Sequence, residues 1–232
     1  MLSNDRELLI SDEERSRALA DAAFADQLFD SLLPVRYRCV SNTQWTSAKV
    51  VEKIGILLES ITPTDGTADD SAAPSSAPLT FIDIGSGVGK LCILLALRMM
   101  QTKMKFFGIE QRKNLVKISE KIRAANKLDN VHFAHRNMME LSWEKFDIYY
   151  LYNPFQEHVT QAGGSQIDHE IDFDRSFYTH YITEVYRQLS WADKGKRLIT
   201  FHGYGEMVPD SWTLRASQII EKGSLCLWEK TK

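Results

Sequence analysis

Glycine at every second position after a short apolar run constrains this chain more than any other feature. The run covers residues 81–84 and holds one acid, Asp83; the glycines after it are Gly85, Gly87 and Gly89. Glycine lets the backbone turn sharply and leaves no Cβ between the main chain and a ligand. Glu110 follows about 20 positions later, after a second apolar run, where a carboxylate can accept from both hydroxyls of a ribose. The pattern predicts a site for a nucleoside cofactor.

Length and composition predict one large domain with an N-terminal addition, because 232 residues with 44% hydrophobic content supply a sizeable core. No apolar run approaches the roughly 18 residues of a membrane-spanning helix. The N-terminus lacks the basic start and apolar stretch of a signal peptide. Three widely spaced cysteines predict neither disulfides nor a zinc site, and we expect a cytoplasmic protein without a metal. The net charge of −3 predicts no general attraction to nucleic acid or membrane.

The chain before the glycines predicts helices and then a linker. Residues 1–60 form an expected N-terminal helical segment, in which Ser11 to Glu14 has the capping-box pattern and Pro34 ends the first apolar repeat. A second helix is expected to begin between Ser41 and Thr46. Residues 61–78 are rich in Pro, Ala, Ser, Asp and Thr, which predicts a flexible linker or surface loop.

Strands and helices alternate over residues 79–232, which predicts an α/β domain with a doubly wound, mostly parallel, seven-stranded sheet. Strands are expected at 79–84, 105–109, 131–134, 146–152 and 197–201, and helices at 88–100, 112–127 and 174–189. Two further strand-like runs, 213–220 and 224–228, are joined by a short turn and predict an antiparallel C-terminal hairpin. This hairpin is not typical of dinucleotide-binding folds.

Together these motifs resemble the class I S-adenosylmethionine (SAM)-dependent methyltransferases, from about Ser41 to the C-terminus. The turn from Asp83 to Gly89 is similar to the first motif of that family, especially in Dot1-like lysine methyltransferases. Residues 107–110 are similar to the second motif, and Asn153 opens a segment at the place of the fourth. The terminal hairpin matches the reversed seventh strand of the family.

The resemblance implies SAM as cofactor and gives roles to individual residues. Asp83 and the turn from Gly85 to Gly89, with Ser86 and Gly87 within it, would hold the methionine end. Glu110 would bind the ribose. Gln111 would lie beside the adenine, and Asn137 stands where many members carry an acid that accepts from the adenine amino group. An amide oxygen can also accept that bond.

A nicotinamide cofactor is the alternative, since glycine-rich turns also occur in dinucleotide-binding folds. One residue separates Gly87 from Gly89 here, whereas the dinucleotide pattern has two at that place. The spacing therefore favours SAM.

The predicted catalytic residues are Asn153, Pro154 and Phe155. An Asn side chain can accept a hydrogen bond from an amine and so aim its lone pair at the methyl group, since positioning supplies much of the rate. Proline stiffens the turn and the aromatic ring offers a stacking surface. The segment resembles the Asn/Asp-Pro-Pro-aromatic motif of amino-group methyltransferases but lacks one proline. The alternative is that these residues only end a strand and pack.

Several other side chains are weaker candidates. Tyr37 and Trp45 would either line the acceptor pocket or pack in the core. The histidines that could act as bases are His158, His169, His180 and His202. The acidic residues within 168–172 predict a solvated loop rather than a metal site. The segment 156–173 is long enough to form a substrate lid with a hinge at Gly163 and Gly164.

The helix at 112–127 presents a stripe of basic residues, which we interpret as a solvated face that includes Arg112. The function expected from all these features is N-methylation of a protein or small-molecule amine. A nucleic-acid base methyltransferase and an inactive SAM-binding regulatory module are the alternatives. The sequence leaves the acceptor and the oligomeric state open.

Overall fold

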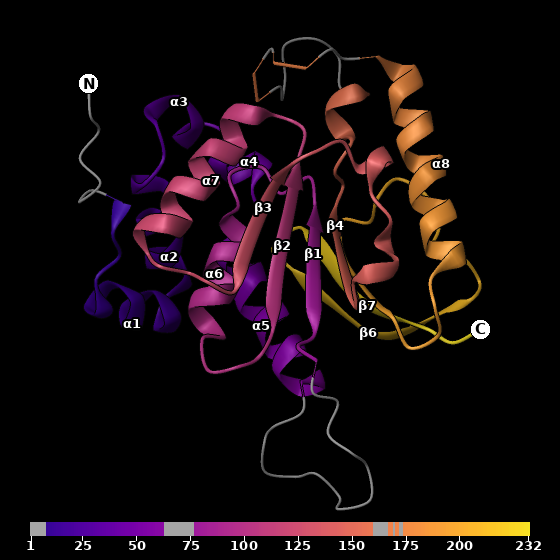
Figure 1. Ribbon diagram of the computed structural model, residues 1–232, viewed down its shortest axis with the longest axis horizontal. Coiled ribbons are helices and arrows are strands. Elements are labelled where there is room, and N and C mark those ends of the chain that lie inside the picture. Colours follow the sequence, from indigo (N-terminus) through magenta and orange to yellow (C-terminus); the bar gives the residue numbers. More distant parts are fainter. Residues whose placement is uncertain (1–7, 63–76, 160–166, 169, 172–173) are drawn as a thin grey trace, which may run out of the picture.

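The computed structural model describes residues 8–62, 77–159, 167–168, 170–171 and 174–232 (Figure 1). Most of the predicted linker, the Gly163–Gly164 hinge and His169 lie outside these residues. The described chain folds around one seven-stranded sheet with the order β3-β2-β1-β4-β5-β7-β6. The strands are β1 (Thr80–Ile84), β2 (Lys105–Glu110), β3 (Val131–His135), β4 (Ile148–Tyr152), β5 (Arg197–Phe201), β6 (Trp212–Ile220) and β7 (Gly223–Lys230).

The first five strands are parallel, and β7 pairs antiparallel with β5 and β6. This arrangement confirms the predicted fold class, including the reversed hairpin. In the register of the sheet, Asp83 on β1 lies opposite Gly108 on β2 and Tyr150 on β4. The carboxyl ends of these strands therefore meet at one edge of the sheet.

Helices cover both faces of the sheet, as alternating strand side chains require. Phe81, Phe106 and Tyr150 belong to the core shared with α5 (Ala48–Ile61), α6 (Lys90–Arg98) and α7 (Lys113–Ala125). Ile82, Tyr149 and Leu198 belong to the core shared with α8 (Arg175–Trp191). Short 3₁₀ turns are η2 (Met138–Glu140), η3 (Trp143–Lys145) and η4 (Gln156–His158). No helix of the described chain is long and apolar enough to cross a membrane.

The N-terminal helices are α1 (Asp12–Ala20), α2 (Ala22–Ser31), α3 (Val35–Arg38) and α4 (Ser41–Gln44). The capping box at Ser11 is present, with Ser11 and Glu14 each bonded to the other's backbone N–H. The first apolar repeat makes two helices rather than one, because Asp21 ends α1 and accepts from Ala23 N and Phe24 N at the start of α2. Ala25, Leu28 and Phe29 of α2 join the core beside α5 and α6.

Candidate functional site

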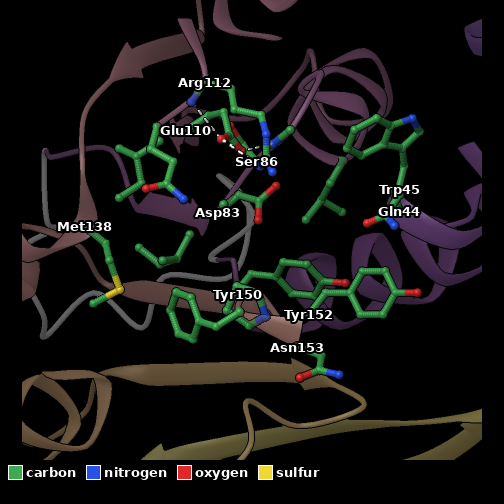
Figure 2. Close-up of a pocket in the computed structure, with 18 of the residues that line it drawn as sticks. Gln44, Trp45, Asp83, Ser86, Glu110, Arg112, Met138, Tyr150, Tyr152 and Asn153 are labelled. Atoms are coloured by element: carbon green, nitrogen blue, oxygen red, sulfur yellow. Dashed lines mark hydrogen bonds and ion pairs between the residues drawn. The ribbon is translucent and has the colours of Figure 1, made fainter. Parts of the chain in front are cut away.

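A cavity opens at the carboxyl ends of β1, β2 and β4, where parallel sheets of this kind bind ligands (Figure 2). Its walls come from distant parts of the sequence. These include the glycine turn, the end of β2, the segment after β3, the segment after β4, the chain at the end of α4, and α8. The cofactor and catalytic residues predicted from the sequence line it, apart from Gly89.

The glycine turn has a backbone that other residues rarely adopt. Gly85 has φ of 80° and Gly87 has φ of 55°. A Cβ on Gly87 would lie 2.4 Å from Trp45 Cζ3, so the indole packs directly on the bare backbone. Gly85 N and Ser86 N donate to Ile109 O at 2.9 and 2.8 Å, which ties the turn to the end of β2. The turn is therefore held open toward the cavity.

Glu110 is buried, and both of its carboxylate oxygens are held in place by backbone donors. Gly87 N donates to Oε2 at 3.1 Å, and Arg112 N donates to Oε1 at 2.9 Å (Figure 2). Burial raises the pKa of Glu110, while the Arg112 guanidinium and these hydrogen bonds act against the rise. The orientation of the carboxylate is thus fixed before any ligand arrives.

Asp83 is 6% exposed at the end of β1. Burial, and secondly the charge of Glu110, raise its pKa to about 8. Two buried acids in one cavity favour a cationic ligand, because a nearby positive charge offsets the cost of ionising both.

Arg112 connects this acidic end of the cavity to the segment that follows β4. Its guanidinium lies 3.7 Å from Glu110 Oε1, 2.7 Å from Glu157 Oε2 and 3.0 Å from Asp168 Oδ1. Its side chain is 4% exposed, so the interpretation of Arg112 as part of a solvated basic face is wrong. Asp168 in turn is a partner of this buried ion cluster rather than part of a solvated loop.

The predicted catalytic segment forms a strained turn after β4. Asn153 has φ of 37°, a left-handed conformation that costs free energy in residues with a Cβ, and its N–H donates to Gly203 O at 3.0 Å. Its Nδ2 donates to Gln156 Oε1 at 3.0 Å. A Cβ on Gly85 would lie 3.4 Å from Pro154 Cβ. The glycine turn and the Asn-Pro-Phe turn therefore lie next to each other in the wall of the cavity.

Phe155 and the predicted adenine residues meet around one tyrosine of α8. The Phe155 ring stacks on Tyr181, with centroids 4.9 Å apart. The Tyr181 hydroxyl donates to Gln111 Oε1 at 3.3 Å and accepts from Asn137 Nδ2 at 2.9 Å. Asn137 Oδ1 caps η2 by accepting from Met139 N at 3.0 Å. That oxygen keeps a second lone pair for a ligand.

Of the weaker candidates described by the structure, Trp45 lies in the cavity wall and the others lie outside it. Trp45 lines the cavity, whereas Tyr37 is buried outside it, where its hydroxyl accepts from Asn114 Nδ2 at 2.8 Å. The described histidines named above lie outside the cavity wall: His158, His180 and His202. Within the described residues, no group of acids, cysteines and histidines could hold a metal ion.

The lining residues missed by the sequence reasoning include Lys90, Glu157 and Tyr181. Lys90 directly follows the last glycine, so its place in the motif was a usable signal. Glu157 and Tyr181 carry no such local signal, because their roles depend on partners far away in the sequence.

Comparison with known proteins agrees with this geometry. Residues 75–174 match the model of a family described as a methyltransferase domain. Among proteins with curated functions, none matches this sequence. An RNA methyltransferase from Salinibacter ruber, solved with S-adenosyl-L-homocysteine, is 18% identical; the match covers 81% of this chain and 94% of that one, with a TM-score of 0.50.

Two further solved structures share the fold. A putative class I SAM-dependent methyltransferase from Listeria monocytogenes is 10% identical over 92% of this chain and 70% of that one, with a TM-score of 0.53. A SAM-dependent O-methyltransferase from Thermotoga maritima is 16% identical over 86% and 72%, with a TM-score of 0.50. At these identities the likeness establishes the fold. The matching methyltransferase domain agrees with the predicted enzyme class and its cofactor, SAM.

The cavity fits such a cofactor on its own evidence. Gly85 and Gly87 present bare backbone, and the acids at the ends of β1 and β2 suit a ligand with positive charge. The buried Ser86 hydroxyl has no hydrogen-bond partner among the described residues, although buried polar groups rarely stay unpaired. A ligand in the cavity would supply one.

Proposed function

We propose that this protein transfers a methyl group from SAM to the nitrogen of a protein or small-molecule amine. The observation that carries the proposal is the 3.4 Å approach of Pro154 to the Cβ position of Gly85. This approach means that the predicted donor-binding turn and the predicted acceptor-binding turn are neighbours in the wall of one cavity. Methyl transfer needs donor and acceptor in line at close approach.

The cofactor contacts follow from the fixed groups. Asp83 and the turn at Gly85–Gly87 would hold the methionine end, and the preset Glu110 carboxylate would accept from the ribose hydroxyls. Gln111 and Asn137 lie together through Tyr181 and would flank the adenine. When bound, SAM supplies an electrophilic methyl group on its sulfonium.

The acceptor contacts come from the segment after β4. Asn153 donates from Nδ2 to Gln156, and none of the hydrogen bonds within the described chain ends on its Oδ1. That oxygen would accept an N–H of the amine and orient the nitrogen lone pair. The Asn153 amide oxygen accepts a hydrogen bond but does not take up a proton. In this proposal the amine enters as the neutral base, and the rate should rise with pH toward the pKa of the acceptor.

A protein or small-molecule amine is preferred for two reasons. The glycine turn is similar to that of Dot1-like lysine methyltransferases, and the net charge of −3 offers no general phosphate-binding footprint. A nucleic-acid base is the second candidate, because the Asn-Pro-Phe turn resembles a base-methylating motif and one structural neighbour is an RNA methyltransferase. An inactive SAM-binding module is the third.

Labelled SAM distinguishes these candidates. Purified protein is incubated with labelled SAM and cell lysate, and parallel samples are then treated with protease or with nuclease. Loss of the macromolecular label on protease treatment supports a protein amine, whereas label in small metabolites supports a small amine. Loss of the label only on nuclease treatment would contradict an amine acceptor and support a nucleic-acid base.

Asn153→Ala tests the catalytic assignment. It should reduce methyl transfer by about 100-fold or more, because a misplaced acceptor loses its orientation. The affinity for S-adenosylhomocysteine, measured by calorimetry, should stay within about threefold of wild type, because Asn153 touches only the acceptor side. Unchanged turnover would remove Asn153 from the mechanism. The control is Gln188→Ala, on α8 away from the cavity, which should leave both measurements unchanged.

A further inference from the structure

Three acids of the segment that follows β4 are fastened to the beginning of α7. Glu157 and Asp168 contact the Arg112 guanidinium at 2.7 and 3.0 Å. Glu170 accepts at 2.8 Å from the backbone N–H of Lys113, the first residue of α7. The first N–H groups of a helix have no partner within the helix, so they favour a carboxylate. The segment is therefore held by a helix end that precedes it by 45 residues or more.

These contacts bring the segment into the wall of the cofactor cavity. Glu157 and Ile167 line the cavity, whereas Asp168 and Glu170 lie outside its wall. Glu157 Oε2 accepts from Ile167 N at 3.3 Å and from Arg112 Nη2 at 2.7 Å. One carboxylate oxygen therefore joins Arg112 to the backbone of Ile167.

The same arginine contacts the acid that is proposed to bind the ribose. Arg112 N donates to Glu110 Oε1 at 2.9 Å, and the guanidinium lies 3.7 Å from that oxygen (Figure 2). Glu110, Glu157 and Asp168 meet three different nitrogens of the guanidinium, Nη1, Nη2 and Nε. A guanidinium is planar and rigid, so a partner that fixes one nitrogen also fixes the direction of the others.

Arg112 also keeps two neighbouring acids compatible. Burial raises the pKa of Glu157, Arg112 opposes that rise, and the charge of Glu110 adds to it. Burial likewise raises the pKa of Glu110, and Arg112 again opposes the rise. The arginine therefore favours the charged form of both acids, which would otherwise repel each other.

We propose that Arg112 is a positioning residue that couples the binding of SAM at Glu110 to the placement of the segment after β4 in the cavity wall. The inference rests on the proposed function, because it assumes that a ribose meets Glu110. Ribose hydroxyls that donate to Glu110 would restrain its carboxylate and favour its charged form, which would tighten its contact with Arg112. The guanidinium would then hold Glu157 and Asp168 more firmly. Such coupling is reciprocal, so weaker contacts to the segment must weaken cofactor binding.

Asp168→Asn tests the coupling from a residue outside the cavity wall. It removes the charge that Arg112 Nε meets. Calorimetry on the full chain should show S-adenosylhomocysteine binding at least about fivefold more weakly than to wild type, as coupling between sites implies. The matched control is Asp147→Asn, which removes a partly buried acid paired with Lys196 just before β4 and should leave the affinity unchanged.

The outcomes separate the inference from the proposed function. Unchanged or tighter binding by Asp168→Asn would overturn the inference and leave the proposed function intact. Absence of binding to the wild-type protein would overturn the proposed function itself.

A double-mutant cycle assigns the coupling to Arg112. In the Arg112→Met background, Asp168→Asn should change the affinity for S-adenosylhomocysteine by less than about twofold, because the connection is already lost. An equal loss of affinity in both backgrounds would mean that Asp168 acts by another route, and would overturn the inference.

Hydrogen exchange followed by NMR decides the question should Arg112→Met fail to fold or bind too weakly to measure. The Ile167 N–H, which donates to Glu157, should exchange at least about fivefold more slowly when S-adenosylhomocysteine saturates the wild-type protein. The slowing should be smaller in Asp168→Asn at saturation. No slowing in wild type, or an equal slowing in both proteins, would overturn the inference, because the ligand would then act on this amide without the Arg112 contacts.

Discussion

Two buried carboxyl groups, Asp83 and Glu110, lie together in the proposed cofactor cavity. Asp83 has a pKa of about 8, because burial and then the charge of Glu110 oppose its ionisation. Burial also raises the pKa of Glu110, but Arg112 and backbone donors favour its charged form. A proton therefore resides on Asp83 in the free protein near neutral pH. A bound cation would favour its release.

Asp83→Asn should stabilise the free protein at high pH. The pKa of Asp83 rises from its ordinary 3.8 to about 8 on folding, so the folded state binds the proton more tightly. Its contribution is complete below about pH 4 and is lost as the pH rises to about 8. Asn does not ionise, so the variant should exceed wild type by at least about 1 kcal/mol in free energy of unfolding at pH 8. Urea denaturation at pH 5 and pH 8 measures this.

Asp147→Asn is the control with the opposite sign. Hydrogen bonds from Thr80 and the charge of Lys196 outweigh partial burial and lower the pKa of Asp147. Its contribution is therefore present above its unfolded pKa and lost as the pH falls. This variant should be less stable than wild type at pH 8. If Asp83→Asn behaves in the same way, Asp83 is ionised and well satisfied in the free protein.

For single residues, local spacing in the sequence was enough to predict which side chains and glycines line the cavity after β1 and β2. The glycines directly follow β1, and Glu110 is the last residue of β2. A short stretch of sequence therefore determines that they lie close together at one edge of the sheet. Arg112 shows the limit, since it lies 56 residues from Asp168 along the chain. The acids that pair with Arg112 come together around it only in the folded chain. The pattern of basic residues along the helix therefore led to the wrong prediction of an exposed side chain. Glu157 and Tyr181 were left without roles for the same reason, because their partners are also far away in the sequence.

Among the elements, the boundary between α1 and α2 shows how one side chain changes a helix pattern. The apolar spacing continues through this region, yet Asp21 leaves the helical conformation with φ of −135° and caps the next helix. Strand positions were predicted within about two residues, as apolar runs between turn residues usually allow. The predicted ends of helices were less accurate. A capping side chain can end a helix even where the apolar spacing continues, as Asp21 does.

Asp21→Ala should destabilise the protein by about 1 kcal/mol, the usual cost of removing an N-cap. The Asp21 carboxylate accepts from Ala23 N and Phe24 N at 3.0 and 3.1 Å, and Ala leaves both donors to water. Urea denaturation measures the change. Ser16→Ala, in the exposed interior of α1, is the control and should cost little, because Ala favours helix. Equal free energies for Asp21→Ala and wild type would mean that the cap contributes nothing.

The whole molecule places its cofactor cavity where distant segments converge. The glycine turn, the end of β2, the segment after β4 and the residues after α4 each supply part of the wall. The N-terminal helices share one core with α5 and α6, and Asp26 ties α2 to Lys90 at the cavity. The sequence predicted the sheet and its donor-binding turn but left the relation of the N-terminal helices to the cavity open, because tertiary contacts alone create it.

A ligand that fills this cavity should stabilise the entire chain. At a free concentration of 100 times its Kd, S-adenosylhomocysteine should add about 2.7 kcal/mol to the free energy of unfolding. For a chain of this size, that raises the Tm by about 5–10 °C. Differential scanning calorimetry measures the change. Glu110→Ala should lose most of the shift, because it removes the preset ribose acceptor. Asn153→Ala should keep it, because the acceptor side does not hold the cofactor. An unchanged Tm in wild type, with ligand in large excess, would contradict the assignment of this cavity as the cofactor site.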